Sequence, residues 1–289
     1  MSEPGTPPDR GRAVPRAPPL RRRRALFRQQ SVLAIAPPRK WSCVPSSGLP
    51  APSAYSGGVA GAGFFDLDRT LLRRSSALAL APAFRARGVI SRRQVAKSAL
   101  WQLLFVLRGA SAEAVRSAAE DAMVLLKGLP VADLRELVAE AMEPVLRPLV
   151  YAEPLRLVQR HRERGERVYV VSATLQEIVE HIAVDLGFDG AVGSTCEIVD
   201  GTYTGRSLSP AHGERKAAAV YELASAEGID LGASTAYSDS HTDVPFLEAV
   251  GHPVAVNPDR GLRRTARARG WPILEFSARY APPARRRAA

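Results

Sequence analysis

The spacing of hydrophobic and polar positions changes near residue 167 and divides the chain into two differently built parts. From there on, short apolar runs alternate with helical segments, which is typical of a parallel β-sheet covered by helices. The apolar runs predict strands over 168–171, 234–237, 253–256 and 273–276, and the segments between them predict helices over 175–186, 214–227, 244–250 and 258–269. The pair Asp200-Gly201, flanked by β-branched and aromatic residues, predicts a β-hairpin within 196–204.

An earlier apolar run, Ala62-Gly63-Phe64-Phe65, predicts another short buried strand. Residues 75–165 instead read as consecutive helices, with Ser or Pro at the expected starts and Gly at the ends. The expected helices begin near Ser75-Ser76, Ser91, Ser111, Pro130 and Pro154. Because about ninety helical residues exceed an ordinary crossover, 75–165 is predicted to be an inserted helical subdomain. One expected helix carries an apolar stripe at Trp101, Leu104, Phe105 and Leu107. This stripe indicates the packed core of the subdomain, and a surface that lies on a membrane is the alternative.

Both ends of the chain have the composition of disordered tails. Residues 1–60 are rich in Pro, Arg, Gly and Ser, and residues 278–289 are basic, so neither can bury much apolar surface. The net charge of +11 divides into +8 for residues 1–63, +4 for 279–289 and −1 for the part between them. The basic arm could meet a nucleic acid or an anionic membrane, or be a solvated tail; the near-neutral core predicts no specific nucleic-acid binding.

Cysteine content and hydropathy indicate in which cellular compartment the protein is expected. The two cysteines, Cys43 and Cys196, form no disulfide or metal-binding framework, and a reducing cytoplasm is expected. No apolar run reaches the ~20 residues that span a bilayer, so no transmembrane segment is predicted.

Asp66 and Asp68 follow the first predicted strand and are the leading candidates for chemistry. Alternation along an extended chain puts both carboxylates on the same side, with Leu67 pointing away. Two carboxylates so close repel, so either one has a raised pKa or a cation neutralises both, and Mg²⁺ suits oxygen ligands. The alternative is a pair of surface aspartates that cap a loop.

Other strands of the predicted sheet also end in polar groups. Because parallel strands end at one edge of a sheet, residues far apart in sequence can meet there. The set comprises Asp66, Asp68, Thr70, Ser172, Asp239 and Asp243, with Lys216 on the preceding helix. Carboxylates, a hydroxyl, a cation and Mg²⁺ are what phosphoryl transfer requires.

These motifs resemble those of the haloacid dehalogenase superfamily phosphatases, in the subgroup (IB) with a helical cap inserted after the first motif. The matching segments are Asp66-Leu67-Asp68-Arg69-Thr70, Ser172 at the end of its strand, Lys216, and the stretch 238–243 with Asp239 and Asp243. The resemblance covers about 62–276 and is nearest to phosphoserine phosphatase-like hydrolases. It implies a Rossmann-like α/β core over 61–74 and 166–277, with the helical cap at 75–165.

The resemblance also implies a role for each matched residue. Asp66 would be the nucleophile that forms an aspartyl-phosphate, and Asp68 would act as general acid and then base. Ser172 and Lys216 would bind phosphate oxygens, with Thr70 bracing the nucleophile loop beside them. Asp66, the Asp68 carbonyl and Asp239 would hold Mg²⁺, and Asp243 would ligate it directly or through water.

Two basic residues stand where phosphoserine phosphatases have an acidic residue after the first motif. Arg73 and Arg74 would suit an anionic or phosphate-rich substrate, or would form a solvated helix start. Ala173-Thr174 and Ser240 also stand where those enzymes have glycine. His241 is expected to be an exposed loop histidine.

The sequence therefore predicts a Mg²⁺-dependent phosphomonoester hydrolase for a small phosphorylated metabolite. Phosphoserine phosphatase proper is one alternative, and a phosphomutase is another if the cap excludes water. A phospho-aspartate switch like a response-regulator receiver is a third. Asp68 and the long cap argue against the switch, because receivers lack such a cap and a positioned acid would shorten the life of the phospho-aspartate.

Removing residues 1–58 is expected to leave the fold and the turnover intact, because their composition is that of a disordered tail. Circular dichroism and kcat/KM at matched salt test this expectation. A truncated protein that fails to fold, or that loses most of its kcat/KM, would contradict it.

Overall fold

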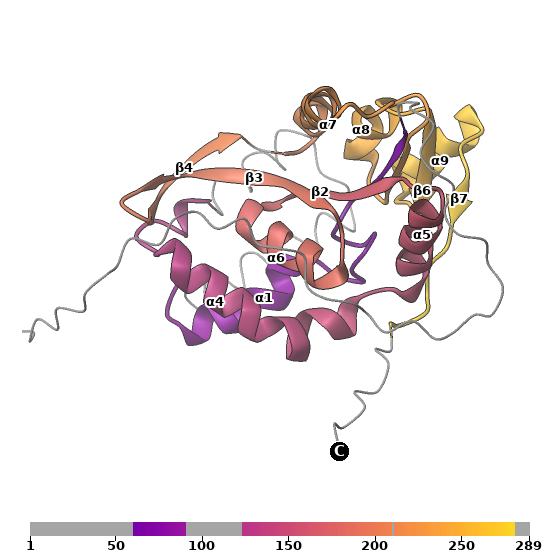
Figure 1. Ribbon diagram of the computed structural model, residues 1–289. Helices are drawn as coiled ribbons and strands as arrows, with labels where there is room; N and C mark the ends of the chain where they lie inside the picture. The colour runs from indigo at the N-terminus through magenta and orange to yellow at the C-terminus, as the bar shows by residue number, and fades with distance from the viewer. Residues whose placement is uncertain (1–59, 91–122, 210, 281–289) are drawn as a thin grey trace, which may run out of the picture. The chain divides into compact units, whose positions relative to one another are not determined.

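The computed structural model describes residues 60–90, 123–209 and 211–280, and its centre is a seven-stranded sheet (Figure 1). The strand order is β4-β3-β2-β1-β5-β6-β7, and every neighbouring pair is parallel except β3 and β4. The strands are β1 (Ala62–Phe65), β2 (Arg167–Leu175), β3 (Gly190–Val199), β4 (Thr202–Ser209), β5 (Thr235–Ser238), β6 (His252–Val256) and β7 (Ile273–Leu274). The predicted α/β class with a mostly parallel sheet is confirmed.

Helices connect these strands close to the predicted ranges. They are α1 (Ser76–Ala86), α4 (Val131–Ala141), α5 (Ala152–Glu163), α6 (Gln176–Leu186), α7 (Glu214–Glu227), α8 (Val244–Glu248) and α9 (Arg260–Arg269). Short irregular turns of helix cover Met142–Leu146, Arg147–Leu149 and His241–Asp243. The helix expected from Ser91, most of the one expected from Ser111, and the apolar stripe 101–107 lie outside the described residues. None of the described helices is long and apolar enough to cross a bilayer.

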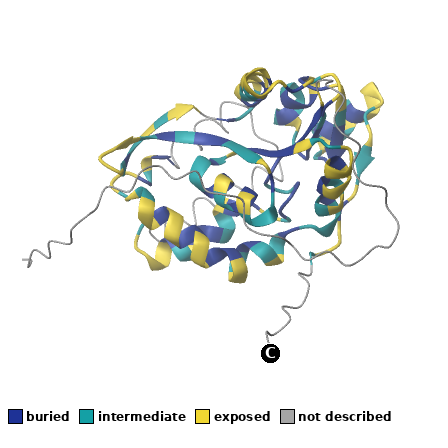
Figure 2. Cartoon of the chain, viewed as in Figure 1, coloured by how far each residue is buried: buried dark blue, intermediate teal, exposed yellow. Residues whose placement is uncertain are grey.

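Alternation along β1 sends its side chains into two apolar clusters. Phe65 lies in the cluster that also holds buried residues of α1, α4 and α6, and its ring stacks on Tyr237 with centroids 4.3 Å apart. Phe64 points to the opposite face, into the cluster with Val220 and Phe246. Figure 2 shows buried residues along the strands and exposed ones on the outer turns of α4. The central strand is thus fixed from both sides.

The predicted hairpin is present, and its second strand pairs with a segment before α4 that the sequence did not predict as its partner. Asp200 and Gly201 both have positive φ (49° and 75°), as a type I′ turn requires. Tyr203 in β4 exchanges backbone hydrogen bonds with Gly128 and Leu129, each within 3.0 Å, and its side chain is buried. Backbone pairing therefore joins the hairpin to the segment that leads into α4.

Helix α5 lies against the sheet, although its residues were assigned to the inserted subdomain. It contacts β1 and β2, and a hydrogen bond of 2.9 Å joins His161 Nε2 to the Tyr237 hydroxyl of β5. A Cβ added at Gly63 would lie 2.9 Å from the His161 ring, so only glycine lets this helix approach so closely. The division into core and cap at residues 75 and 165 stays a prediction, and the packing of α5 favours a cap that ends before residue 152.

Residues 278–280, expected to belong to an unstructured tail, instead pair with the segment that leads back from the inserted helices. Ala278 accepts from Ala152 N and Tyr280 donates to Val150 O, both at 3.0 Å. The same returning segment pairs on its other side with the outgoing chain, through Tyr151 N to Leu71 O at 2.9 Å. Backbone pairing carries little sequence signal, which is why composition alone did not predict this attachment.

Shortening the C-terminus is expected to destabilise the protein only once it reaches this attachment. A chain that ends at Tyr280 keeps the pairing, whereas one that ends at Phe276 also loses two hydrogen bonds from Ser277 and Ala278 to Glu153. At a net ~1 kcal/mol per bond, the longer deletion should lower the free energy of unfolding by roughly 1–4 kcal/mol. Urea denaturation of both chains measures this, and equal midpoints would contradict it.

Candidate active site

Four segments bring the predicted site residues to one edge of the sheet. Asp66 follows β1 directly, and its backbone N donates to Tyr237 O of β5 at 2.9 Å. Ser172 lies in β2, the other neighbour of β1, and Asp239 follows β5. Since all three strands are parallel, their carboxyl ends meet, as the sequence led us to expect.

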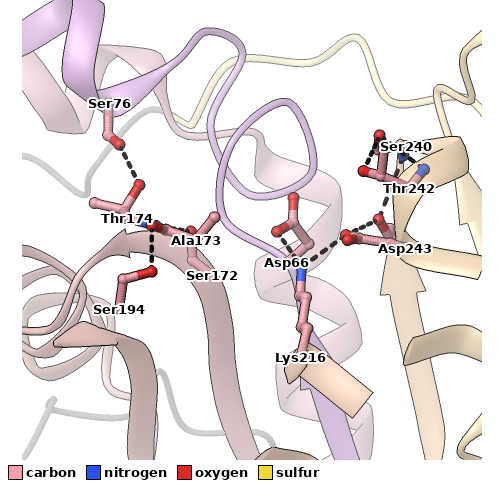
Figure 3. A network of polar contacts seen from close by, with 11 residues as sticks. Asp66, Ser76, Ser172, Ala173, Thr174, Ser194, Lys216, Ser240, Thr242 and Asp243 are labelled. Atoms are coloured by element: carbon pink, nitrogen blue, oxygen red, sulfur yellow. Dashed lines mark hydrogen bonds and ion pairs between the residues drawn. The ribbon is translucent and has the colours of Figure 1, made fainter. Parts of the chain in front are cut away.

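Lys216 lies between two carboxylates at this edge (Figure 3). Its ammonium donates to Asp66 Oδ1 at 2.6 Å and to Asp243 Oδ2 at 2.7 Å. Ser238 also donates to Asp243 Oδ2 at 2.7 Å, so this carboxylate is held by two donors. Burial alone would lower the pKa of Lys216, which is 2% exposed, but Asp243 and Asp66 together raise it above the usual lysine value. The lysine is therefore charged.

A glycine places Lys216 at the start of α7. Gly213 precedes the helix with φ 56° and ψ −131°, a conformation essentially reserved for glycine. Its carbonyl accepts from Lys216 N at 3.1 Å. The chain can thus turn sharply into the helix and direct the lysine inward within one turn.

Asp66 has an unusual pKa for an aspartate. Its burial raises the pKa to about 7, Lys216 opposes this shift, and Asp243 adds to it. Asp239 likewise has a pKa well above its usual range, first because it is buried, with Arg69 opposing and Asp66 adding to the effect. Added positive charge would therefore bring both groups to the ionised form.

Asp68 lies at the N-terminus of α1. Its Oδ1 accepts from Ser76 N at 2.8 Å, which satisfies one free donor of the helix. Burial raises the pKa of Asp68, and the hydrogen bonds from Ser76 only partly offset it. A carboxyl that keeps its proton more readily than usual suits a general acid.

The predicted hydroxyl groups are buried nearby. Ser172 Oγ accepts from Thr174 N at 3.1 Å, and the Thr174 hydroxyl lies 3.1 Å from that of Ser76 (Figure 3). Thr70 is fully buried, and its Oγ1 has no hydrogen-bond partner within the part of the chain that the structure describes. The Thr174 hydroxyl thus joins β2 to the start of α1, and its backbone N binds Ser172 within the strand.

The candidate substrate residues Arg73 and Arg74 have different surroundings. The Arg73 guanidinium lies over the Tyr151 ring, 5.9 Å from its centroid, and Arg74 is exposed. Among the described residues, neither forms an ion pair with the clustered aspartates. His241 is exposed, and its backbone N donates to Asp259 at 2.8 Å, which matches the expectation of a loop histidine.

Two residues without a predicted role contact Asp239. Arg69 Nε forms an ion pair with Asp239 Oδ2 at 3.2 Å, from a backbone with φ 66°. Asp259 N donates to the Asp239 carbonyl at 2.8 Å, and the Asp259 side chain caps α9 through Leu262 N. The opposite charge of Arg69 within the first motif was the available signal, but its backbone conformation was not readable from sequence.

The arrangement fits a magnesium ion at Asp66 and Asp239. In the described ranges, no three His, Cys, Asp or Glu side chains form a complete metal site. Mg²⁺ does not need one, because it keeps several waters and binds one or two carboxylates plus substrate phosphate. The buried Asp239 Oδ2 accepts no hydrogen bond among the described residues, and Arg69 Nε contacts it at 3.2 Å without hydrogen-bond geometry, so a metal ion could displace this contact. Asp243 Oδ2 is less available, since Lys216 and Ser238 bind it.

Comparisons with known proteins identify hydrolases and phosphatases that this chain resembles. A family model described as haloacid dehalogenase-like hydrolase matches residues 64–248. A probable phosphatase from Mycobacterium tuberculosis is 45% identical over 216 residues, 75% of this chain and 75% of that protein. A phosphoserine phosphatase from the same organism is 38% identical over 237 residues, 79% and 77% of the two chains. A solved structure of a protein of unknown function from Bordetella pertussis is 31% identical, covers 75% and 99%, and has a TM-score of 0.66.

The raised pKa of Asp66 predicts a pH dependence of stability in metal-free protein. Because the folded value of about 7 exceeds the usual 3.8, the stabilisation from its protonated form is complete below pH 3.8 and is lost as the pH rises to about 7. The melting temperature of the wild type minus that of Asp66→Asn should therefore fall across this window and level off above it. Thermal denaturation from acidic to neutral pH measures this, with Mg²⁺ expected to reduce the slope. A melting-temperature difference that stays constant with pH would contradict the raised pKa of Asp66.

Proposed function

The chain belongs to the haloacid dehalogenase-like hydrolases and is a phosphatase of that family, and on that premise we propose that Asp66 attacks the phosphorus of a small phosphate monoester. The resemblance to the haloacid dehalogenase superfamily phosphatases is confirmed, and so is the assignment to the phosphoric monoester hydrolases, while membership of subgroup IB stays a prediction. The observation that carries the proposal is the buried Asp66 carboxylate beside a charged lysine, with a second aspartate two residues further on.

The first step would transfer the phosphoryl group to Asp66. One Asp66 oxygen, held by Lys216, attacks in line, and the leaving alkoxide takes a proton from Asp68. Lys216 and Ser172 would bind the non-bridging oxygens of the phosphoryl group. The buried ammonium is already in place, so it costs little reorganisation as charge develops.

The second step would hydrolyse the aspartyl-phosphate. Asp68, now ionised, takes a proton from a water molecule that attacks the phosphorus, and Asp66 is released as a carboxylate. Asp68 is suited to both roles because its burial raises the pKa while Ser76 N stabilises the ionised form. The hydrogen bond from Ser76 N also holds the Asp68 carboxylate in one orientation.

Mg²⁺ is the cofactor we propose for this site. Asp66, Asp239 and the backbone carbonyl of Asp68 would hold it, and Asp243 would act through Lys216 or through a bound water. When bound, the ion supplies positive charge for the phosphate oxygens. Its charge would also lower the pKa of Asp66 and so favour the ionised nucleophile.

The substrate is proposed to be a small phosphorylated metabolite. One relative is named a phosphoserine phosphatase, which makes phosphoserine the first compound to test. Arg73 lies over the Tyr151 ring and Arg74 is exposed, and their binding of an anionic substrate stays a prediction. Activity on phosphoserine well above that on other phosphate esters would assign phosphoserine phosphatase proper.

Paired substitutions at the two aspartates test the mechanism. Asp66→Asn removes the attacking oxygen, so neither turnover nor phospho-enzyme is expected. Asp68→Asn keeps the nucleophile but lacks the acid, which should cost roughly 10²–10⁴-fold in kcat, and less with aryl phosphates because their leaving groups need little protonation. Steady-state rates on alkyl and aryl phosphates measure this difference. Arg267→Gln, at an exposed site in the last turn of α9, serves as the control and should keep wild-type rates.

The same variants separate a phosphatase from a phospho-aspartate switch. When an aryl phosphate is supplied as the activated donor, hydroxylamine-labile phosphate should accumulate on Asp68→Asn and be absent from Asp66→Asn. Full activity in Asp66→Asn would contradict the nucleophile assignment. A wild-type phospho-form that persists for minutes without turnover would instead favour the switch.

A further inference from the structure

Arg69 holds a strained backbone conformation in the middle of the nucleophile loop. Its φ of 66° lies in the left-handed region, which a residue with a long side chain adopts at a cost of about 1–2 kcal/mol and glycine adopts freely. The loop is closed by hydrogen bonds from Leu71 N and Leu72 N to Leu67 O, both at 2.9 Å. An arginine at such a position points to a use for its side chain, since glycine would fit the backbone better.

The side chain of Arg69 contacts the carboxylate oxygen that is best placed for a metal ion. Its Nε lies 3.2 Å from Asp239 Oδ2. This contact lacks hydrogen-bond geometry, and Oδ2 accepts no hydrogen bond from any described residue. Asp239 is 4% exposed, whereas the Arg69 side chain is 33% exposed. A buried anion is therefore paired with a cation that reaches solvent.

This pair is built differently from a structural ion pair in the same chain. Arg147 binds both oxygens of Asp185 with hydrogen bonds of 2.9 and 2.7 Å. Arg69 makes one contact without hydrogen-bond geometry, so it can leave Asp239 at a smaller cost. A long side chain that is one-third exposed also has room to move away.

We propose that Arg69 is a positioning residue that neutralises Asp239 in the metal-free enzyme and competes there with the divalent cation. The inference rests on the proposed metal site of the function above. Binding of Mg²⁺ breaks the Arg69–Asp239 contact and moves the guanidinium toward solvent. Arg69 thus holds the Asp239 side chain in place before metal binding, and it weakens the affinity for the ion by occupying one of its ligands.

Isothermal titration of Mg²⁺ into the full-length, chelator-treated protein tests this competition without using turnover. Removal of a charge so near the ion should tighten binding, so Arg69→Gln should lower the Kd for Mg²⁺ on the order of tenfold. Arg69→Lys keeps the charge and should stay nearer the wild-type value. Arg267→Gln removes an exposed charge in the last turn of α9 and should leave the Kd unchanged.

Arg69→Gly guards against a folding defect, because it relieves the left-handed backbone while removing the same charge. It should also bind Mg²⁺ more tightly than the wild type. Unchanged or weaker binding in both Arg69→Gln and Arg69→Gly would overturn the proposal. If the wild type binds no Mg²⁺ but Arg69→Gly does, the competition is supported; if neither binds, both the competition and the metal site fail, while the nucleophile assignment is tested separately by Asp66→Asn.

Discussion

The buried ammonium of Lys216 is the interaction on which the site depends. Without it, Asp66 and Asp243 would be two anions taken out of water beside each other, at a cost of several kcal/mol for each ion. With it, a single cation binds both carboxylates at 2.6 and 2.7 Å. The positive charge that offsets the burial of the two carboxylates can also bind the phosphoryl group. Folding and the proposed catalysis therefore depend on the same residue.

The rest of the structure serves to bring that cation and its partners to one place. β1 is held by parallel neighbours on both sides, which fixes where Asp66 leaves the sheet. Gly213 allows the turn that points Lys216 inward, and Ser238 holds Asp243 from the end of β5. Asp68 in turn binds helix α1 through Ser76, so any movement of that helix would act on the proposed acid.

The sequence was informative where chemistry and periodicity coincide and silent where contacts depend on backbone geometry. The strand at 62–65, the hairpin at Asp200-Gly201 and the helix at 214–227 were predicted because apolar period and turn residues agree there. The contact of Arg69 with Asp239 requires a left-handed φ, which residue identity argues against. The position of α5 on the sheet and the pairing of residues 278–280 rest on a close glycine contact and on backbone bonds, which hydrophobic patterns do not encode.

A double-mutant cycle on Lys216 and Asp243 tests the central claim most directly. Lys216→Met leaves two buried carboxylates without their cation and should lower the free energy of unfolding by about 3–5 kcal/mol at neutral pH in metal-free protein. Adding Asp243→Asn removes one of those anions. The double variant should therefore lose clearly less free energy of unfolding than the two single variants lose in sum. Urea denaturation of the four proteins gives this coupling energy. Losses that add to within about 0.5 kcal/mol would show that the two residues act independently and would contradict the account.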